Sequence, residues 1–155
     1  DLFDGRTFAS IDEGFAYARG AGLASIGERG LAVADDLGPG LVYAGFSFGV
    51  GIAQELAQTR AGTRGALLIY SCLPVTEFGA AWPDGVPVQI HGKAGDEFFD
   101  EDLPAARELV ASTPAAELFV YPGEQHLFAD SSLDAYDPEA AALLMERVQA
   151  FLAAV

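Results

Sequence analysis

Short apolar runs alternate along the chain with segments in which apolar residues recur at helical spacing. The runs predict strands over residues 41–46, 66–71, 87–91 and 117–121. The nearly unbroken run at 66–71 is typical of a strand covered on both faces. Helical spacing predicts helices over about residues 11–19, 23–36, 50–59 and 136–154.

Local signals mark where helices begin and end. Ser10 and Glu13 form a capping box for the first helix, and Gly38-Pro39-Gly40 is a clear break before the first strand. A further helix is expected from Asp102, its predicted N-cap, to about Ala111, with Pro104 in its first turn. The last helix is expected to bury a stripe formed by Ala142, Leu143, Met145, Val148, Phe151 and Leu152.

This order of elements predicts the fold class. Strands that alternate with helices favour an α/β fold with a parallel sheet and helices on both of its faces. The 155 residues are expected to form a single domain, residues 1–155, and a hydrophobic content of 51% excludes a disordered chain. No apolar run approaches the roughly 20 residues that a membrane-spanning helix needs.

The charge of the chain narrows the choice of partners. Asp and Glu number 23 against 8 Lys and Arg, which gives a net charge of −15. Such a surface repels phosphate backbones, so we expect no nucleic-acid partner and no attraction to anionic membranes. Cys72 is the only cysteine, which excludes an intramolecular disulfide and favours a reducing, cytoplasmic location. Its place in an apolar run predicts that it is buried.

The stretch Gly45-Phe46-Ser47-Phe48-Gly49 joins a predicted strand to a predicted helix. A G-x-S-x-G sequence in this position is typical of a nucleophile elbow, in which small flanking residues allow a tight turn. The serine then projects at the carboxyl edge of the sheet, beside free N–H groups of the helix amino terminus. Ser47 is therefore the candidate nucleophile.

A serine nucleophile needs a base, and the base needs an acid that orients it. His126 follows the last predicted strand, so it should lie at the same sheet edge as Ser47. It is preferred to His91, which ends a strand and is expected to pack or hydrogen-bond locally. Asp96, after the third predicted strand, is the candidate acid. Other carboxylates remain alternatives, namely Glu97, Asp100, Glu101 and Asp102.

The chain resembles the dienelactone hydrolase family of α/β-hydrolases over nearly its whole length. The resemblance rests on Asp1-Leu2-Phe3, Ile90-His91-Gly92-Lys93-Ala94-Gly95-Asp96 and Tyr121-Pro122-Gly123-Glu124-Gln125-His126-Leu127-Phe128-Ala129. It implies that Ser47, Asp96 and His126 hydrolyse a small-molecule ester or lactone through an acyl-enzyme, without a metal or cofactor. It also implies an oxyanion contact from the backbone of Phe48 and substrate contacts from Arg6, Phe46 and Phe128.

The chain also departs from the founding members of this family, which carry cysteine where Ser47 stands and arginine where Asp130 stands. These differences favour general esters over anionic lactones. Family members have further strands before the opening segment, so the chain is expected to be the C-terminal portion of the fold. Strand 41–46 would then be an uncovered edge, which an N-terminal segment of the same protein is expected to complete.

A serine hydrolase of dienelactone hydrolase type is therefore the preferred function. A non-catalytic binding protein with this fold and an acyltransferase with the same triad are the alternatives. A homodimer is a further candidate assembly.

Overall fold

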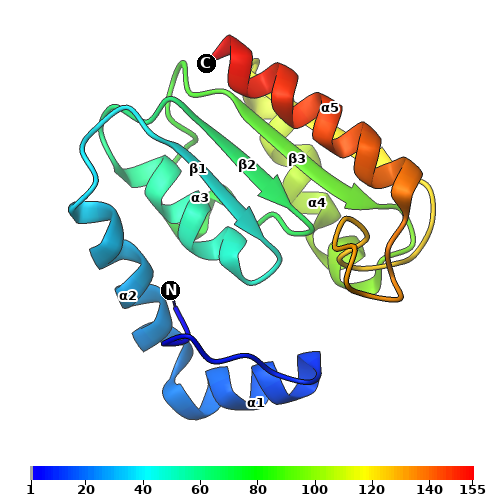
Figure 1. Cartoon of the computed structure of the whole chain (residues 1–155). Coiled ribbons are helices and arrows are strands. Elements are labelled where there is room, and N and C mark those ends of the chain that lie inside the picture. Colours follow the sequence, from blue (N-terminus) through cyan, green and yellow to red (C-terminus); the bar gives the residue numbers. More distant parts are fainter. Residues whose placement is uncertain (1) are drawn as a thin grey trace. The chain divides into compact units, whose positions relative to one another are not determined.

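The computed structural model describes residues 2–155, which divide into two compact units (Figure 1). The N-terminal unit ends at Gly38, and the larger unit, called the sheet unit below, runs from Pro39 to Val155. Each unit has its own packing and is described by itself.

The N-terminal unit consists of the helices α1 (Ile11–Ala21) and α2 (Leu23–Asp35). Ser10 Oγ accepts a hydrogen bond from the backbone N–H of Glu13 at 3.2 Å, and Glu13 Oε2 accepts one from the N–H of Ala9 at 3.0 Å. The predicted cap is confirmed, although its glutamate reaches one residue further back than in the usual box. Gly22, at φ 87°, allows the sharp passage from α1 to α2.

The sheet unit contains a parallel sheet whose strands keep their sequence order, β1-β2-β3-β4. The strands are β1 (Val42–Phe46), β2 (Gly65–Ile69), β3 (Val88–Lys93) and β4 (Ala116–Tyr121). The helices are α3 (Gly49–Thr59), α4 (Glu97–Ser112) and α5 (Pro138–Ala154), with a 3₁₀ turn at Val75–Glu77. The predicted parallel α/β arrangement is confirmed.

Helices cover both faces of this sheet, α3 and α4 on one side and α5 on the other (Figure 1). Successive residues of a strand point to opposite faces. In β2, Leu68 accordingly packs in the core that includes α3 and α4, and Ile69 in the core that includes α5. All of β2 is buried, which confirms the expectation of a strand covered on both faces.

Helix α4 begins earlier than predicted. Asp96, not Asp102, is its N-cap, because a carboxylate oxygen of Asp96 accepts a hydrogen bond from the backbone N–H of Phe98 at 3.1 Å. Phe99 in the first turn is fully buried against the sheet, and this packing selects the earlier start. Pro104 consequently lies inside the helix instead of in its first turn.

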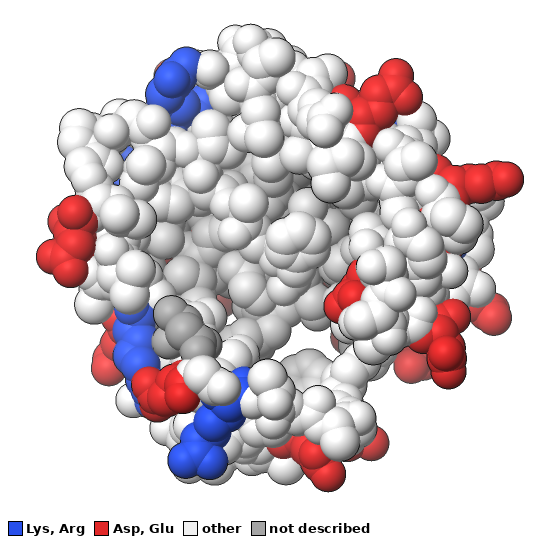
Figure 2. Space-filling model, viewed as in Figure 1, with Lys and Arg blue, Asp and Glu red and all other residues white. Residues whose placement is uncertain are grey.

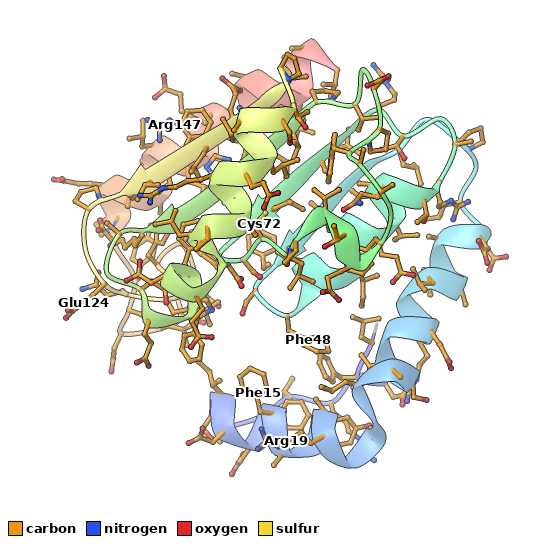
Figure 3. All side chains as sticks on the ribbon, turned by 180° about the vertical axis from the view of Figure 1, so that it is seen from behind. Phe15, Arg19, Phe48, Cys72, Glu124 and Arg147 are labelled. Atoms are coloured by element: carbon orange, nitrogen blue, oxygen red, sulfur yellow. The ribbon has the colours of Figure 1, made fainter. Side chains whose placement is uncertain are left out.

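Asp102 supports the chain beyond β2 instead. Its Oδ2 accepts hydrogen bonds from Ser71 Oγ at 2.5 Å and from the backbone N–H of Cys72 at 3.2 Å. Cys72 is buried, as predicted (Figure 3). Burial, followed by the charge of Asp102, raises the pKa of the Cys72 thiol to about 12. The thiol is therefore a packing group with little nucleophilic character at neutral pH.

The buried stripe of α5 is narrower than predicted. Its buried residues are Ala140, Leu144 and Phe151, whereas the expected stripe members Leu143, Met145 and Leu152 expose 40%, 52% and 47% of their surface. Residues 140–145 are all apolar. The sequence therefore does not mark which side of the helix faces the sheet.

His91 is a core residue, as expected. Its Nδ1 lies 2.9 Å from the Tyr121 hydroxyl and its Nε2 lies 3.3 Å from Gln89 Oε1. Its ring stacks on Phe119 at 5.1 Å, while Arg147 of α5 lies over the same aromatic ring (Figure 3). Burial, followed by the charge of Arg147, lowers the pKa of His91 to about 4.

This pKa predicts a loss of stability in mild acid. Unfolded His91 gains a proton below about pH 6.5, whereas the folded protein resists protonation down to about pH 4. The contribution of neutral His91 to the free energy of unfolding is therefore complete above pH 6.5. It is lost as the pH falls towards 4, by up to about 3 kcal/mol. Urea unfolding measured across this pH interval should show that the free energy of unfolding depends less on pH in His91→Gln than in the native protein. Equal slopes would contradict the assignment.

Candidate active site

Ser47 lies in the turn between β1 and α3, where the structure forms a nucleophile elbow. Its φ is +48°, a left-handed conformation that is costly for a residue with a Cβ. Its backbone N–H donates to the carbonyl of Ile69 at 2.7 Å, which extends the sheet pairing into the turn. A Cβ at Gly45 would lie 2.6 Å from the Cα of Val50, so only glycine allows strand and helix to approach this closely.

His126 reaches this serine from the loop after β4. Its Nε2 lies 2.9 Å from Ser47 Oγ, and its Nδ1 lies 2.6 Å from Asp96 Oδ2. A carboxylate can only accept, so Nδ1 carries the proton and Nε2 presents its lone pair to the serine hydroxyl. The structure thus brings together the three residues that the sequence predicts as nucleophile, base and acid.

Of the candidate carboxylates, Asp96 is the one that contacts His126. Its side chain is 1% exposed. One oxygen accepts from Phe98 N–H and the other faces His126, so both oxygens are used. The alternatives Glu97, Asp100, Glu101 and Asp102 belong to α4.

Lys93 supports the loop that carries the histidine. This side chain is 1% exposed, and its Nζ donates to Asp137 Oδ2 at 2.6 Å and to Gln125 Oε1 at 2.8 Å. Gln125 directly precedes His126, and Asp137 caps α5 through the backbone N–H groups of Glu139 and Ala140. The hydrogen bond from Lys93 is the main cause that lowers the pKa of Asp137. No motif or spacing in the sequence indicates this role, because both partners of Lys93 lie far along the chain.

Aromatic rings enclose the imidazole. The ring centre of Phe98 lies 4.9 Å from that of His126, and the ring centre of Tyr70 lies 5.5 Å away. Tyr70 has φ +73°, and its hydroxyl accepts a hydrogen bond from the N–H of Ala129 at 3.0 Å. A strained tyrosine just after β2 has no signal in the sequence, because its role depends on a loop far along the chain.

A pocket of about 400 Å³ adjoins these residues. Its walls are formed by Phe46, Tyr70, Leu127, Ala129, Asp130 and Ser131. Phe46, a predicted substrate contact, is therefore a wall residue. Phe128 is not, because it is fully buried and packs beneath Tyr70 with its ring centre 5.2 Å away.

The remaining predicted contacts are not among the wall residues of this pocket. Phe48 stands at the amino end of α3, directly after Ser47 (Figure 3). Arg6 belongs to the N-terminal unit, where its guanidinium lies 5.2 Å from the ring centre of Tyr17. Across residues 2–155, no group of three or more His, Cys, Asp or Glu side chains is arranged to hold a metal ion. No helix in the same range is long and apolar enough to cross a membrane.

The dienelactone hydrolase family model matches residues 36–155. No curated protein matches the sequence. Among solved structures, a Klebsiella pneumoniae protein described as a candidate dienelactone hydrolase is similar at TM-score 0.62 and 21% identity, over 84% of this chain and 61% of that one. The dienelactone hydrolase-like promiscuous phosphotriesterase P91 from metagenomic libraries is similar at TM-score 0.67 and 20% identity, over 97% of this chain and 71% of that one.

The Bacillus cereus carboxylesterase is similar at TM-score 0.51 and 17% identity, over 82% of this chain and 59% of that one. The chain thus spans less than two thirds of the Klebsiella and Bacillus proteins. At these identities the likeness demonstrates the shared α/β-hydrolase fold.

The ion pair between buried Lys93 and partly exposed Asp137 predicts that its two neutralising variants lower stability unequally. Asp137→Asn keeps an oxygen that can cap α5 but leaves the buried Lys93 ammonium without a counter-charge. Lys93→Met leaves Asp137, whose side chain is 34% exposed, able to reach water. We expect Asp137→Asn to lower Tm by about 5 °C or more, and by more than Lys93→Met does.

The double variant should be more stable than Asp137→Asn alone, which thermal unfolding of the four proteins measures as a double-mutant cycle. A larger loss in Lys93→Met than in Asp137→Asn would show that the lysine acts through packing and not through its charge.

Proposed function

The chain belongs to the dienelactone hydrolase family, and on this premise we propose that it carries the active site of a serine hydrolase that cleaves a carboxylic ester or lactone. The observation that carries the proposal is the hydrogen-bonded chain from Ser47 Oγ through His126 to Asp96, with distances of 2.9 and 2.6 Å. Its members come from the ends of different strands, which is how α/β-hydrolases assemble a catalytic triad.

In the proposed reaction, Ser47 Oγ attacks the carbonyl carbon while His126 Nε2 removes the hydroxyl proton. Asp96 stabilises the imidazolium that forms. The tetrahedral intermediate then expels the alkoxide, which takes the proton from His126, and an acyl-enzyme remains. A water molecule, deprotonated by His126, attacks this ester, and the acid product leaves as Ser47 regains its proton.

The developing oxyanion needs donors that are already in place. The backbone N–H of Phe48 is the proposed donor, because it follows the nucleophile at the amino end of α3. The helix dipole adds a favourable field at this point. One such donor contributes about 10²–10³ in rate in comparable sites.

Removal of any member of the proposed triad should abolish most turnover of a short p-nitrophenyl ester by the protein. Ser47→Ala and His126→Ala should each lower kcat/KM about 10³-fold or more, and Asp96→Asn somewhat less. Combining the changes should add little, because the three groups act as one unit. Ser112→Ala, which alters an exposed serine on α4, is the matched control. Native turnover in Ser47→Ala would refute the mechanism.

A fluorophosphonate probe tests the nucleophile without any choice of substrate. We expect one adduct, located on the peptide that contains Ser47 by mass spectrometry, and none in Ser47→Ala or His126→Ala. Persistent absence of label from the native protein would favour a binding protein with this fold. Ester formation with an added alcohol acceptor would identify an acyltransferase instead.

A further inference from the structure

The walls of the pocket of about 400 Å³ include chain neighbours of the proposed reacting residues. Phe46 precedes Ser47 and Leu127 follows His126 in the chain, and both are wall residues. Tyr70, a third wall residue, lies 5.5 Å from the His126 ring. A group in this pocket would therefore lie against the residues next to the proposed nucleophile and base, where part of a bound ester can be held.

The wall of this pocket carries one carboxylate. Asp130 Oδ1 accepts hydrogen bonds from the N–H and the hydroxyl of Ser132, at 2.9 and 2.6 Å. These bonds lower the pKa of Asp130, so the group is ionised at neutral pH. Its Oδ2 has no hydrogen-bond partner among residues 2–155, so this oxygen can contact a ligand.

The aromatic walls suit a cation as well. The rings of Phe46 and Tyr70 lie 6.0 Å apart at 52°, and Phe46 exposes 55% of its surface. A cation within about 6 Å of an aromatic face is attracted by the ring quadrupole. Burial, and also the charge of Asp130, raise the pKa of the Tyr70 hydroxyl, so this wall remains uncharged beside the carboxylate.

Among the described residues, no basic side chain stands in the wall to offset this charge. Nearby Lys93 is buried and paired with Asp137, and Arg147 lies over Phe119 and Tyr121. Acidic side chains are also spread along the border of the visible face of the sheet unit (Figure 2), within a chain of net charge −15. A cation is thus favoured both at long range and inside the pocket.

We propose that this pocket is a subsite for a positively charged, alkylated ammonium group of the ester substrate, with Asp130 as its counter-charge and Phe46 and Tyr70 as its walls. The proposal rests on the function proposed above and specifies the class of substrate. It assigns Asp130 as a specificity-determining residue. The charge selects the substrate, while Ser47, His126 and Asp96 perform the chemistry.

The test compares esters that differ only in charge. One series places trimethylammonium, its neutral tert-butyl isostere or a carboxylate at the end of the acyl chain of a p-nitrophenyl ester. A second series places the same groups on the alcohol portion, as in choline and 3,3-dimethylbutyl esters. In one of the two series, kcat/KM should favour the cation over its neutral isostere about fivefold at low salt. Added salt should reduce this preference.

Asp130→Asn keeps the oxygen that Ser132 binds and removes the charge, so the ratio of cationic to neutral turnover should fall to about one. Asp130→Lys should favour the carboxylate ester. Asp134→Asn is the matched control, because it removes an exposed charge from the same loop outside the pocket wall and should preserve the ratio.

The outcomes separate this proposal from the function on which it rests. Turnover of neutral esters without a cation preference in either series overturns the subsite alone. A preference that survives Asp130→Asn, or that Asp134→Asn removes equally, also overturns it. Absence of turnover in every series, together with absence of fluorophosphonate label on Ser47, overturns both proposals.

Discussion

The carboxylate of Asp96 joins the fold of the sheet unit to its candidate site. One oxygen caps α4 through Phe98 N–H, and the other holds His126 Nδ1, so the start of a helix and the orientation of a side chain form one constraint. The group is 1% exposed, and an unpaired oxygen at this depth would be costly. Gly92 makes the arrangement possible, because a Cβ there would collide with the Phe99 ring that seats the first turn of α4 on β3.

Backbone hydrogen bonds also fix the loops along the carboxyl edge of the sheet. Strand pairing continues past the last residues of β1, β2 and β3, so the loops that follow these strands leave the sheet in a fixed register. The bonds that do this run from Ser47 N to Ile69 O, from Tyr70 N to His91 O and from Ala94 N to Tyr121 O, at 2.7, 2.7 and 2.9 Å. The proposed nucleophile, Tyr70 in the pocket wall and the proposed acid therefore begin from rigid backbone positions, which is what a preorganised site requires.

The sequence predicts those parts of the site that depend on neighbouring residues, and it predicts poorly those that depend on residues far along the chain. The elbow at Ser47 depends on its immediate neighbours, and topology alone brings His126 to the same edge. The start of α4 was predicted wrongly at Asp102, because two aspartates can cap the helix and only burial of its first turn decides between them. Lys93 was missed as a support because its partners lie 32 and 44 residues away, beyond any periodic signal.

A serine hydroxyl, unlike a thiolate, is a nucleophile only while its proton is being removed. The proposed chemistry of Ser47 thus depends on the position of His126 at every moment of attack. Asp96 fixes the tautomer and direction of this imidazole, and Lys93 fixes its loop through Gln125. These supports are buried, whereas Asp130 in the pocket wall is exposed. If Asp130 selects the substrate as proposed, the preference can therefore change there without disturbing the groups that are proposed to perform the reaction.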